Sequence, residues 1–318
     1  MTEALANPFD VRLTAIRYAA LDTNLFEFRK LDGSAMPAVE PGAHIDIHLP
    51  NGMMRQYSLV TADSDPNAYV VGIKRDRASR GGSKFIHDNL RVGTVLKIGG
   101  PRNNFPLNEK ADHTVLLAGG IGITPIWCMA QRLIKQGASW EMFYSCRDRA
   151  EVAFLEELGK LPQVKIHIDA ESNGKFLDIP GIVAAAPKGS HFYCCGPGPM
   201  LAAYEAATKN VPEGHMHIEY FSAKEESALE GGYKVQLKRS GKEFVVPPGK
   251  SLLHVLRDAG IDVAYSCEEG VCGACETVVI SGTPDHRDNI LTEAERKASK
   301  TMMICCSGSK SDLLVLDI

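Results

Sequence analysis

Short apolar stretches separated by glycine and proline occur throughout the first third of the chain. Several place an apolar residue at about every second position, as in HIDIHLP, RQYSLVT, AYVVGIKR and TVLKIGGP. Period-two alternation between turn residues is typical of antiparallel strands with one buried face. The pattern predicts an antiparallel β-barrel over residues 1–108.

The pattern changes in the middle of the chain. Apolar runs now alternate with segments of helical period, such as TPIWCMAQRLIKQG and PMLAAYEAATKN. Strands that alternate with helices imply a parallel sheet. We therefore predict an α/β domain over residues 109–223. A polar segment that ends in Gly-Gly, residues 224–232, is typical of a linker, and we expect a third domain over residues 233–318.

Composition narrows the class of protein. The 318 residues are 44% hydrophobic and 23% charged, with a net charge of -4, which gives no indication of a nucleic-acid surface. No apolar run approaches the ~20 residues that span a bilayer. The first residues, MTEALANPFDVRL, lack the basic and apolar segments of a signal peptide. We expect a cytoplasmic protein with no membrane or nucleic-acid partner.

Three cysteines lie close together in the last segment, in YSCEEGVCGACE. Cys267, Cys272 and Cys275 have the C-x4-C-x2-C spacing of plant-type [2Fe-2S] clusters. Cys305 is the predicted fourth ligand, and Cys306 is the alternative. A structural zinc site is the competing interpretation, although zinc sites usually pair two C-x2-C motifs.

The loop between these cysteines contains two glycines. Gly270 and Gly273 allow the loop amides to approach the sulfur atoms closely. The scattered cysteines Cys128, Cys146 and Cys194 are interpreted as small core residues.

Two glycine-containing turns in the α/β segment indicate a nucleotide site. LLAGGIGITPI has the pattern of a strand, a turn and a helix start, and YCCGPGPML repeats it. The free amides of a helix N-terminus bind anions, so pyrophosphate is the expected ligand. In the first turn, we expect Thr124 to cap the helix. The residues predicted to bind the nucleotide are Gly119, Gly120, Gly122, Thr124, Cys195, Gly196 and Pro197.

The choice of nicotinamide depends on charged residues further along. Arg147 and Arg149 could contact a ribose phosphate or lie on a solvated surface, and acidic residues stand among them. Asp169 or Glu171 could accept a hydrogen bond from a ribose hydroxyl. The pattern favours NADH, with Arg147 and Asp169 as candidate ligands.

The barrel segment contains a second set of anion-binding candidates. In RQYS, Arg55 and Tyr57 are two residues apart and share one face of a strand, whereas Ser58 faces the other way. A guanidinium group binds phosphate well, and a phenol can hydrogen-bond a ribityl chain. The turn Gly81-Gly82-Ser83 begins a predicted helix, with Lys74 and Arg80 nearby. A terminal phosphate held there fits FMN.

These motifs together resemble the ferredoxin–NADP reductase superfamily. The resemblance implies that Cys195 lies beside the nicotinamide and that Ser58 lies near the reactive nitrogen of the flavin. Glu219 and Phe221 match the Glu-x-Phe motif of the family, whose aromatic ring lies near the flavin. Ser58, Cys195 and Glu219 are thus the candidate catalytic residues. Ser222 stands where the family has glycine.

The order of the three segments resembles the phthalate dioxygenase reductase family. The resemblance implies a multidomain protein with a flavin β-barrel, an α/β nicotinamide domain with a parallel sheet, and an α+β ferredoxin domain of β-grasp fold. It also implies that electrons pass from NADH through FMN and a [2Fe-2S] cluster to a Rieske-type oxygenase or demethylase. One chain with all three sites is expected to act as a monomer.

Other functions remain open at this point. The chain could deliver electrons to a small-molecule or haem acceptor instead of an oxygenase. A nucleotide-binding regulator with a redox-sensing cluster, or a structural module held by a metal, would also contain some of these motifs.

Overall fold

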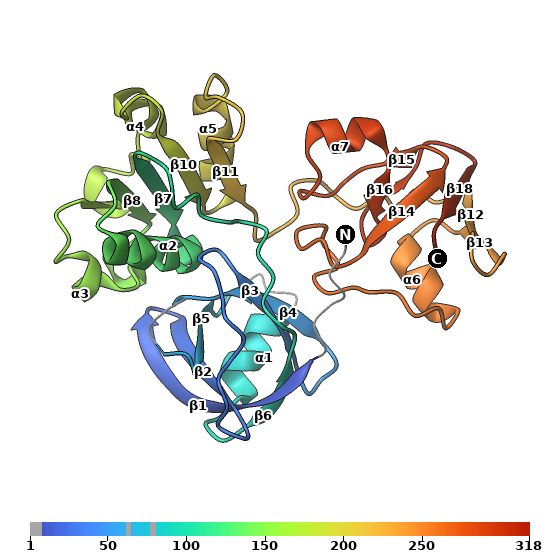
Figure 1. Ribbon diagram of the computed structural model, residues 1–318, viewed down its shortest axis with the longest axis horizontal. Coiled ribbons are helices and arrows are strands. Elements are labelled where there is room, and N and C mark those ends of the chain that lie inside the picture. The colour runs from blue at the N-terminus through green and yellow to red at the C-terminus, as the bar shows by residue number, and fades with distance from the viewer. Residues whose placement is uncertain (1–7, 62–64, 77–80) are drawn as a thin grey trace. The chain divides into compact units, whose positions relative to one another are not determined.

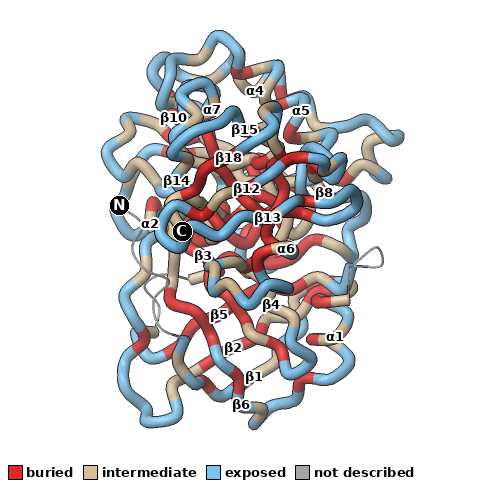
Figure 2. The backbone as a smooth tube through the Cα atoms, turned by 90° about the vertical axis from the view of Figure 1, so that its right-hand side faces the viewer, coloured by how far each residue is buried: buried red, intermediate tan, exposed pale blue. Residues whose placement is uncertain are grey.

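The computed structural model describes residues 8–61, 65–76 and 81–318. These form two compact units, Met1–Glu219 and Tyr220–Ile318. Figure 1 shows their elements, and in Figure 2 the buried residues concentrate on the strands while most connecting loops are exposed. None of the helices in these described ranges is long and apolar enough to cross a membrane.

A six-stranded antiparallel sheet forms the first part of the first unit. Its strand order is β4-β3-β6-β1-β2-β5. A bridge between Leu59 and Val71 and the hydrogen bond from Val60 N to Val70 O, 2.9 Å, join the two edges, so the sheet closes into a barrel. The elements are β1 (Phe9–Ala20), β2 (Thr23–Lys30), β3 (His44–His48), β4 (Met54–Ser58), β5 (Tyr69–Lys74), α1 (Gly82–Asn89) and β6 (Val95–Ile98).

The barrel core follows the alternation in the sequence. Phe26 and Phe28 of β2, and Ile45 and Ile47 of β3, are buried at alternate positions and meet inside the barrel. One buried face, as in β6, explains why the period-two pattern predicted this sheet, whereas β3 and β5 are buried on both faces over most of their length.

A five-stranded parallel sheet forms the second part of the first unit. Its order is β11-β10-β7-β8-β9. Since β7 and β10 are neighbours although β8 and β9 lie between them in sequence, the order reverses at this pair, and ligands bind at the carboxyl ends of such strands. The elements are β7 (Thr114–Gly119), η1 (Gly120–Gly122), α2 (Ile123–Gln136), β8 (Trp140–Cys146), η2 (Arg149–Glu151), α3 (Leu155–Leu158), β9 (Val164–Ile168), η3 (Asp169–Ser172), α4 (Ile179–Ala185), β10 (His191–Cys195), α5 (Gly198–Ala207) and β11 (Met216–Glu219).

The two parts of this unit share a continuous core. Ala20, Val60 and Val70 of the barrel belong to the same hydrophobic cluster as Leu116 and Ile126 of the α/β part. The barrel and the parallel sheet thus pack as one compact body, and the predicted boundary at residue 108 stays a prediction.

The second unit contains a mixed sheet of order β13-β12-β18-β14-β16. Strands β12 and β18 are parallel, and the other neighbours are antiparallel. Leu253 and Leu256 of α6 belong to the same buried core as the sheet residues Val235 and Leu314. The elements are β12 (Tyr233–Leu237), β13 (Glu243–Val246), α6 (Leu252–Asp258), β14 (Glu276–Ser281), β15 (Pro284–Asp285), α7 (Glu293–Ala298), β16 (Thr301–Met303), β17 (Gly308–Ser309) and β18 (Leu313–Leu316).

The predicted linker has no helix or strand and lies against the second unit. Ala228 N donates to Cys306 O at 2.8 Å, and Gly232 N donates to Val246 O at 2.8 Å. Its backbone is therefore anchored beside the cysteine segment.

Candidate functional site

The three candidate catalytic residues come together at the ends of strands. Ser58 ends β4, and Cys195 and Glu219 end the neighbouring strands β10 and β11, where their backbones are paired in register. The Ser58 hydroxyl and the Cys195 thiol both hydrogen-bond the Glu219 carboxyl group. The barrel and the parallel sheet thus contribute to one polar cluster.

Burial controls the charge of this cluster. It raises the pKa of Glu219 to about 8, although hydrogen bonds from Ser58 and Cys195 oppose the shift. The pKa of the Cys195 thiol is raised too, chiefly by burial and also by the adjacent Glu219. The cluster is therefore largely neutral at pH 7.

One atom of the cluster lacks a protein partner. Glu219 Oε2 is buried without a hydrogen bond to any residue in the described parts of the chain. Buried polar atoms are nearly always satisfied in native proteins. A bound cofactor that presents a polar group here would provide the missing contact.

Some residues of the predicted flavin phosphate site lie together, namely Arg55 and the glycines at the start of α1. A Cβ atom added to Gly82 would lie 2.6 Å from Nε of Arg55, so the Arg55 side chain lies directly against the first residue of α1. Gly81, before it, has φ +94°, a left-handed conformation that favours glycine. A guanidinium group and the N-terminus of an eight-residue helix both attract anions, so this corner fits a phosphate.

Other members of the predicted phosphate site are placed differently. Lys74 Nζ pairs with Glu151 Oε2 at 2.7 Å and so contacts the α/β part. The Ser83 hydroxyl accepts a hydrogen bond from Asp76 N at 3.2 Å. Arg80 lies outside the described residues. Tyr57 packs at the edge of the barrel core, and burial raises the pKa of its phenol, which stays neutral.

The two glycine turns pack directly against each other. A Cβ on Gly122 would lie 2.2 Å from Cys195 O, and one on Gly119 would lie 2.5 Å from Cδ of Pro197. A Cβ on Gly196 would likewise lie 3.2 Å from Cα of Gly119. Backbone packing therefore requires glycine at position 122, whereas a Cβ at Gly119 or Gly196 would meet chiefly the side chains of Pro197 and Met200.

Gly120 differs from the other glycines of this turn. It has φ +52°, and a Cβ added there would meet nothing within 4 Å. Gly120 is therefore the residue of the turn that faces open space, where a nucleotide can approach the backbone.

The prediction that Thr124 caps the helix was wrong. The N-cap of α2 is Gly122, and Thr124 lies within the first turn, where its hydroxyl donates to Ile121 O at 3.0 Å. The 3-10 helix η1 continues directly into α2, so no residue with an extended backbone stands at the cap position. The Thr124 hydroxyl therefore bonds a carbonyl of the preceding turn and caps no amide.

The predicted ribose contacts lie after the next two strands. Arg147 is exposed directly after β8, and Asp169 follows β9, where it accepts from the Ser145 hydroxyl at 3.3 Å. Arg149 pairs with Glu171 at 2.5 Å. The charge of Arg149 is thus compensated within the protein, which favours a ribose without a phosphate.

The four predicted cluster ligands are buried side by side in the second unit. The Cys267 thiol contacts those of Cys272 and Cys305, and the Cys275 thiol contacts that of Cys305. Contact with Cys267 and burial raise the pKa of Cys272, while contact with Cys305 and burial raise the pKa of Cys275. Thiolates in this environment would need a bound cation, which the iron of a [2Fe-2S] cluster would supply.

The sulfur of the alternative ligand Cys306 packs against the backbone of the cysteine loop at Gly270. A Cβ on Gly270 would lie 2.5 Å from Cys306 Sγ, and this sulfur lies 3.8 Å from Met303 O. Gly270, with φ +69°, is thus required for packing against Cys306. Within the described parts of the chain, no three His, Cys, Asp or Glu side chains converge on a single metal ion.

Phe221 belongs to the second unit and is 41% exposed. Its predicted place beside the flavin stays a prediction. Ser222, the departure from the family pattern, accepts a hydrogen bond from Asn289 Nδ2 at 3.3 Å through its carbonyl oxygen. This backbone contact does not depend on the side chain.

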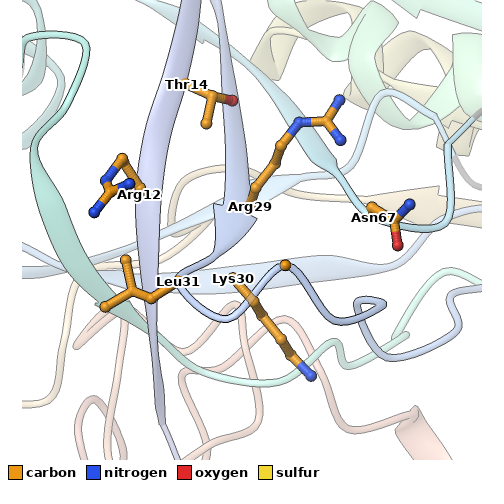
Figure 3. Close-up of a pocket in the computed structure, with 7 residues that line it drawn as sticks. Arg12, Thr14, Arg29, Lys30, Leu31 and Asn67 are labelled. Carbon is orange, nitrogen blue, oxygen red and sulfur yellow. The ribbon is translucent and has the colours of Figure 1, made fainter.

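A hollow on the barrel surface lies apart from these groups (Figure 3). Arg29 there pairs with Glu27 at 3.0 Å and with Asp65 at 2.6 Å, which compensates its charge. None of the predicted site residues that the structure describes lines it. The lining residues are Arg12, Thr14, Arg29, Lys30, Leu31, Gly33 and Asn67.

Two family models match the chain. The model of the 2Fe-2S iron-sulfur cluster binding domain matches residues 235–309, and that of the oxidoreductase NAD-binding domain matches residues 116–206. The expected cluster and nicotinamide sites are therefore confirmed at the level of domains.

Relatives match over nearly the whole length. Phenoxybenzoate dioxygenase subunit beta of Ectopseudomonas oleovorans is 47% identical over 98% of this chain and 98% of its own. Tetrachlorobenzoquinone reductase of Sphingobium chlorophenolicum is 47% identical over 99% of this chain and 100% of its own. The solved structure of phthalate dioxygenase reductase, described as modular for electron transfer from pyridine nucleotides to [2Fe-2S], has a TM-score of 0.76 at 36% identity and covers 98% of both chains. The predicted multidomain fold is confirmed.

Proposed function

Because the chain belongs to the phthalate dioxygenase reductase family, we propose that it delivers electrons from NADH to a terminal Rieske-type oxygenase or demethylase. The chain is an NADH-dependent flavin and iron–sulfur oxidoreductase, with FMN and a [2Fe-2S] cluster as its cofactors. The observation that supports an oxygenase partner is the match, over 98% of both chains, to a subunit of a dioxygenase.

The residues divide the work between the cofactors. Arg55, Gly81 and Gly82 would hold the phosphate of FMN, and Tyr57 its ribityl chain. Bound FMN accepts two electrons from NADH and releases them singly, which a [2Fe-2S] cluster requires. The protein's contribution is to orient the donor and acceptor and to control protons near them.

The polar cluster supplies that proton control. The neutral carboxyl group of Glu219 holds a proton beside the Ser58 hydroxyl, and the Cys195 thiol also hydrogen-bonds this carboxyl group. Ser58 would present its hydroxyl to the reactive edge of the flavin, and Cys195 would border the nicotinamide. In the second unit, the ligands of the [2Fe-2S] cluster would be Cys267, Cys272, Cys275 and Cys305.

A test combines a cluster variant with two acceptors. Cys272→Ser should keep NADH-dependent reduction of ferricyanide, which accepts electrons from flavin, and should lose reduction of a purified Rieske-type oxygenase. The wild-type protein should reduce both. Equal oxygenase reduction by the two proteins would remove the cluster from the path. NADH binding without any turnover would instead indicate a regulator.

A second candidate function is reduction of a quinone. The relative from Sphingobium chlorophenolicum, as similar to this chain as the dioxygenase subunit, is a tetrachlorobenzoquinone reductase. If quinone is the acceptor, kcat/KM with a chlorinated benzoquinone should exceed that with any oxygenase. A haem acceptor would be recognised by faster turnover with a cytochrome than with either.

We also propose that the protein acts as a cytoplasmic monomer. All three cofactor sites belong to one chain, so electron transfer needs no second copy. Light scattering of the FMN-loaded protein should give the mass of one chain, about 34.6 kDa.

A further inference from the structure

One buried hydroxyl group connects two loops at the nucleotide end of the parallel sheet. Tyr144, on β8, is fully buried. Its hydroxyl donates to Gly120 O at 3.1 Å and accepts from Ala153 N at 3.3 Å. Gly120 belongs to the glycine turn after β7, and Ala153 to the loop after β8, so Tyr144 holds the two loops together.

Cys146 is the next residue on the same face of β8, and it contacts the amide group of Gly120. The Gly120 amide hydrogen-bonds the Cys146 sulfur, and this thiol lies 3.7 Å from Glu151 O, to which it donates. Burial raises the pKa of Cys146 to about 11, which keeps it a neutral thiol. Two side chains of β8 therefore contact both polar backbone groups of Gly120, and the Gly120 carbonyl also accepts from Ile123 N.

The orientation of the Gly120 backbone matters for binding of a nucleotide. Gly119 and Gly122 are closed in by the second turn, whereas Gly120 faces open space in a left-handed conformation. Rotation of its peptide groups would reorient the backbone that the nucleotide approaches. A rigid arrangement there lowers the entropy lost on binding.

The loop that anchors Tyr144 is itself attached to the barrel. Glu151 pairs with Lys74 of β5 at 2.7 Å, and Leu21 N donates to Ala150 O at 2.8 Å. The support of the glycine turn thus extends through Tyr144 and the η2 loop to the flavin part of the same unit.

We propose that Tyr144 is a positioning residue for NADH. Its hydroxyl, with the Cys146 thiol, holds Gly120 in the orientation that binds the pyrophosphate of the nucleotide. This rests on the proposed function, because NADH must be the electron donor. The sequence gives no motif for it, since a tyrosine and a cysteine two apart on a strand are indistinguishable from core residues.

The test removes one oxygen atom. Tyr144→Phe keeps the ring but leaves Ala153 N without this partner and Gly120 O with the amide of Ile123 alone, so KM for NADH should rise roughly tenfold while kcat at saturating NADH changes little. Ferricyanide is the acceptor, so the result does not depend on an oxygenase. If the wild-type protein does not oxidise NADH, the proposed function fails independently of Tyr144.

Tyr204, on helix α5 against the same sheet, provides a matched control. It is also fully buried, and its hydroxyl donates to Phe192 O at 2.9 Å and accepts from His217 N at 3.3 Å. Tyr204→Phe should lower the melting temperature about as much as Tyr144→Phe and leave KM unchanged. An unchanged KM in Tyr144→Phe, or an equal rise in both variants, would overturn the proposal.

A second variant tests the proposal if the first one does not fold. If Tyr144→Phe does not fold, Cys146→Ala removes the other contact to Gly120 with a smaller change in packing. We expect a several-fold rise in KM for NADH with little change in kcat. A KM equal to that of the wild-type protein would then refute the positioning role.

Discussion

The Ser58 hydroxyl, at the end of a barrel strand, hydrogen-bonds the Glu219 carboxyl group at the end of the parallel sheet. The contact joins residues that lie in different sheets, and Cys195 completes it from the adjacent strand. Since burial keeps the carboxyl largely protonated at pH 7, the site holds a proton where the two sheets meet.

Glu219 should make the stability of the first unit depend on pH. Its pKa rises from 4.5 to about 8 on folding, so between these values the folded protein binds a proton that the unfolded chain has lost. The free energy of unfolding therefore falls as pH rises through this window, by at most about 1.4 kcal/mol per pH unit. Glu219→Gln should flatten this slope in urea unfolding between pH 5.5 and 7.5. Glu213→Gln, an exposed change in the turn before β11, should keep it.

Cys305 and Cys306 should differ sharply in cluster binding. Cys305→Ala removes a thiol that contacts those of Cys267 and Cys275, whereas Cys306→Ala removes one that faces Gly270. Iron and sulfide content should fall to near zero in the first variant and stay at about two of each in the second. A full cluster in Cys305→Ala would identify Cys306 as the ligand.

The glycines of the first turn should respond differently to an added methyl group. Gly122→Ala places a Cβ 2.2 Å from Cys195 O and should destabilise the protein by about 3 kcal/mol or more. Gly120→Ala meets only the strain of its left-handed backbone, about 1–2 kcal/mol, but the methyl group enters the space proposed for NADH. Thermal unfolding and KM for NADH distinguish the two. Equal melting temperatures would contradict the packing of the two turns.

Arg55 should determine the affinity for FMN. Arg55→Gln removes the positive charge beside the start of α1 and should weaken FMN binding about ten- to a hundredfold, because a hydrogen bond to a charged group contributes about 1.5–3 kcal/mol. Arg75→Gln removes an arginine that pairs with Asp88 at 3.0 Å and should change the affinity little. Titration of flavin fluorescence with the flavin-free proteins measures both. Similar losses in the two variants would indicate a general charge effect.

The sequence predicts best where chemistry restricts the spacing of residues. Four thiols around two iron atoms need a loop of fixed length, so Cys267, Cys272 and Cys275 are recognisable in the sequence alone. Close packing of two turns needs glycine, which makes Gly122 visible in the same way, although its contact is to the other turn.

Contacts between distant segments could not be predicted from the sequence. Lys74 stands beside the predicted phosphate site in sequence, yet a salt bridge directs it to Glu151 in the α/β part. The capping role expected for Thr124 failed because the 3-10 turn before it changed the helix start. Tyr144 was missed because its hydroxyl acts across loops that sequence periodicity does not relate.

The position of β18 has a consequence for synthesis of the protein. This strand lies in the middle of the sheet of the second unit, between β12 and β14, and its Leu314 and Leu316 are fully buried. The ribosome makes all four cluster cysteines before it makes β18. The sheet that supports the ligands is therefore complete only when its last strand is in place, so the cluster site depends on residues that follow every ligand in the sequence. A chain that stops before Leu313 should accordingly fail to retain its cluster, although every ligand is present.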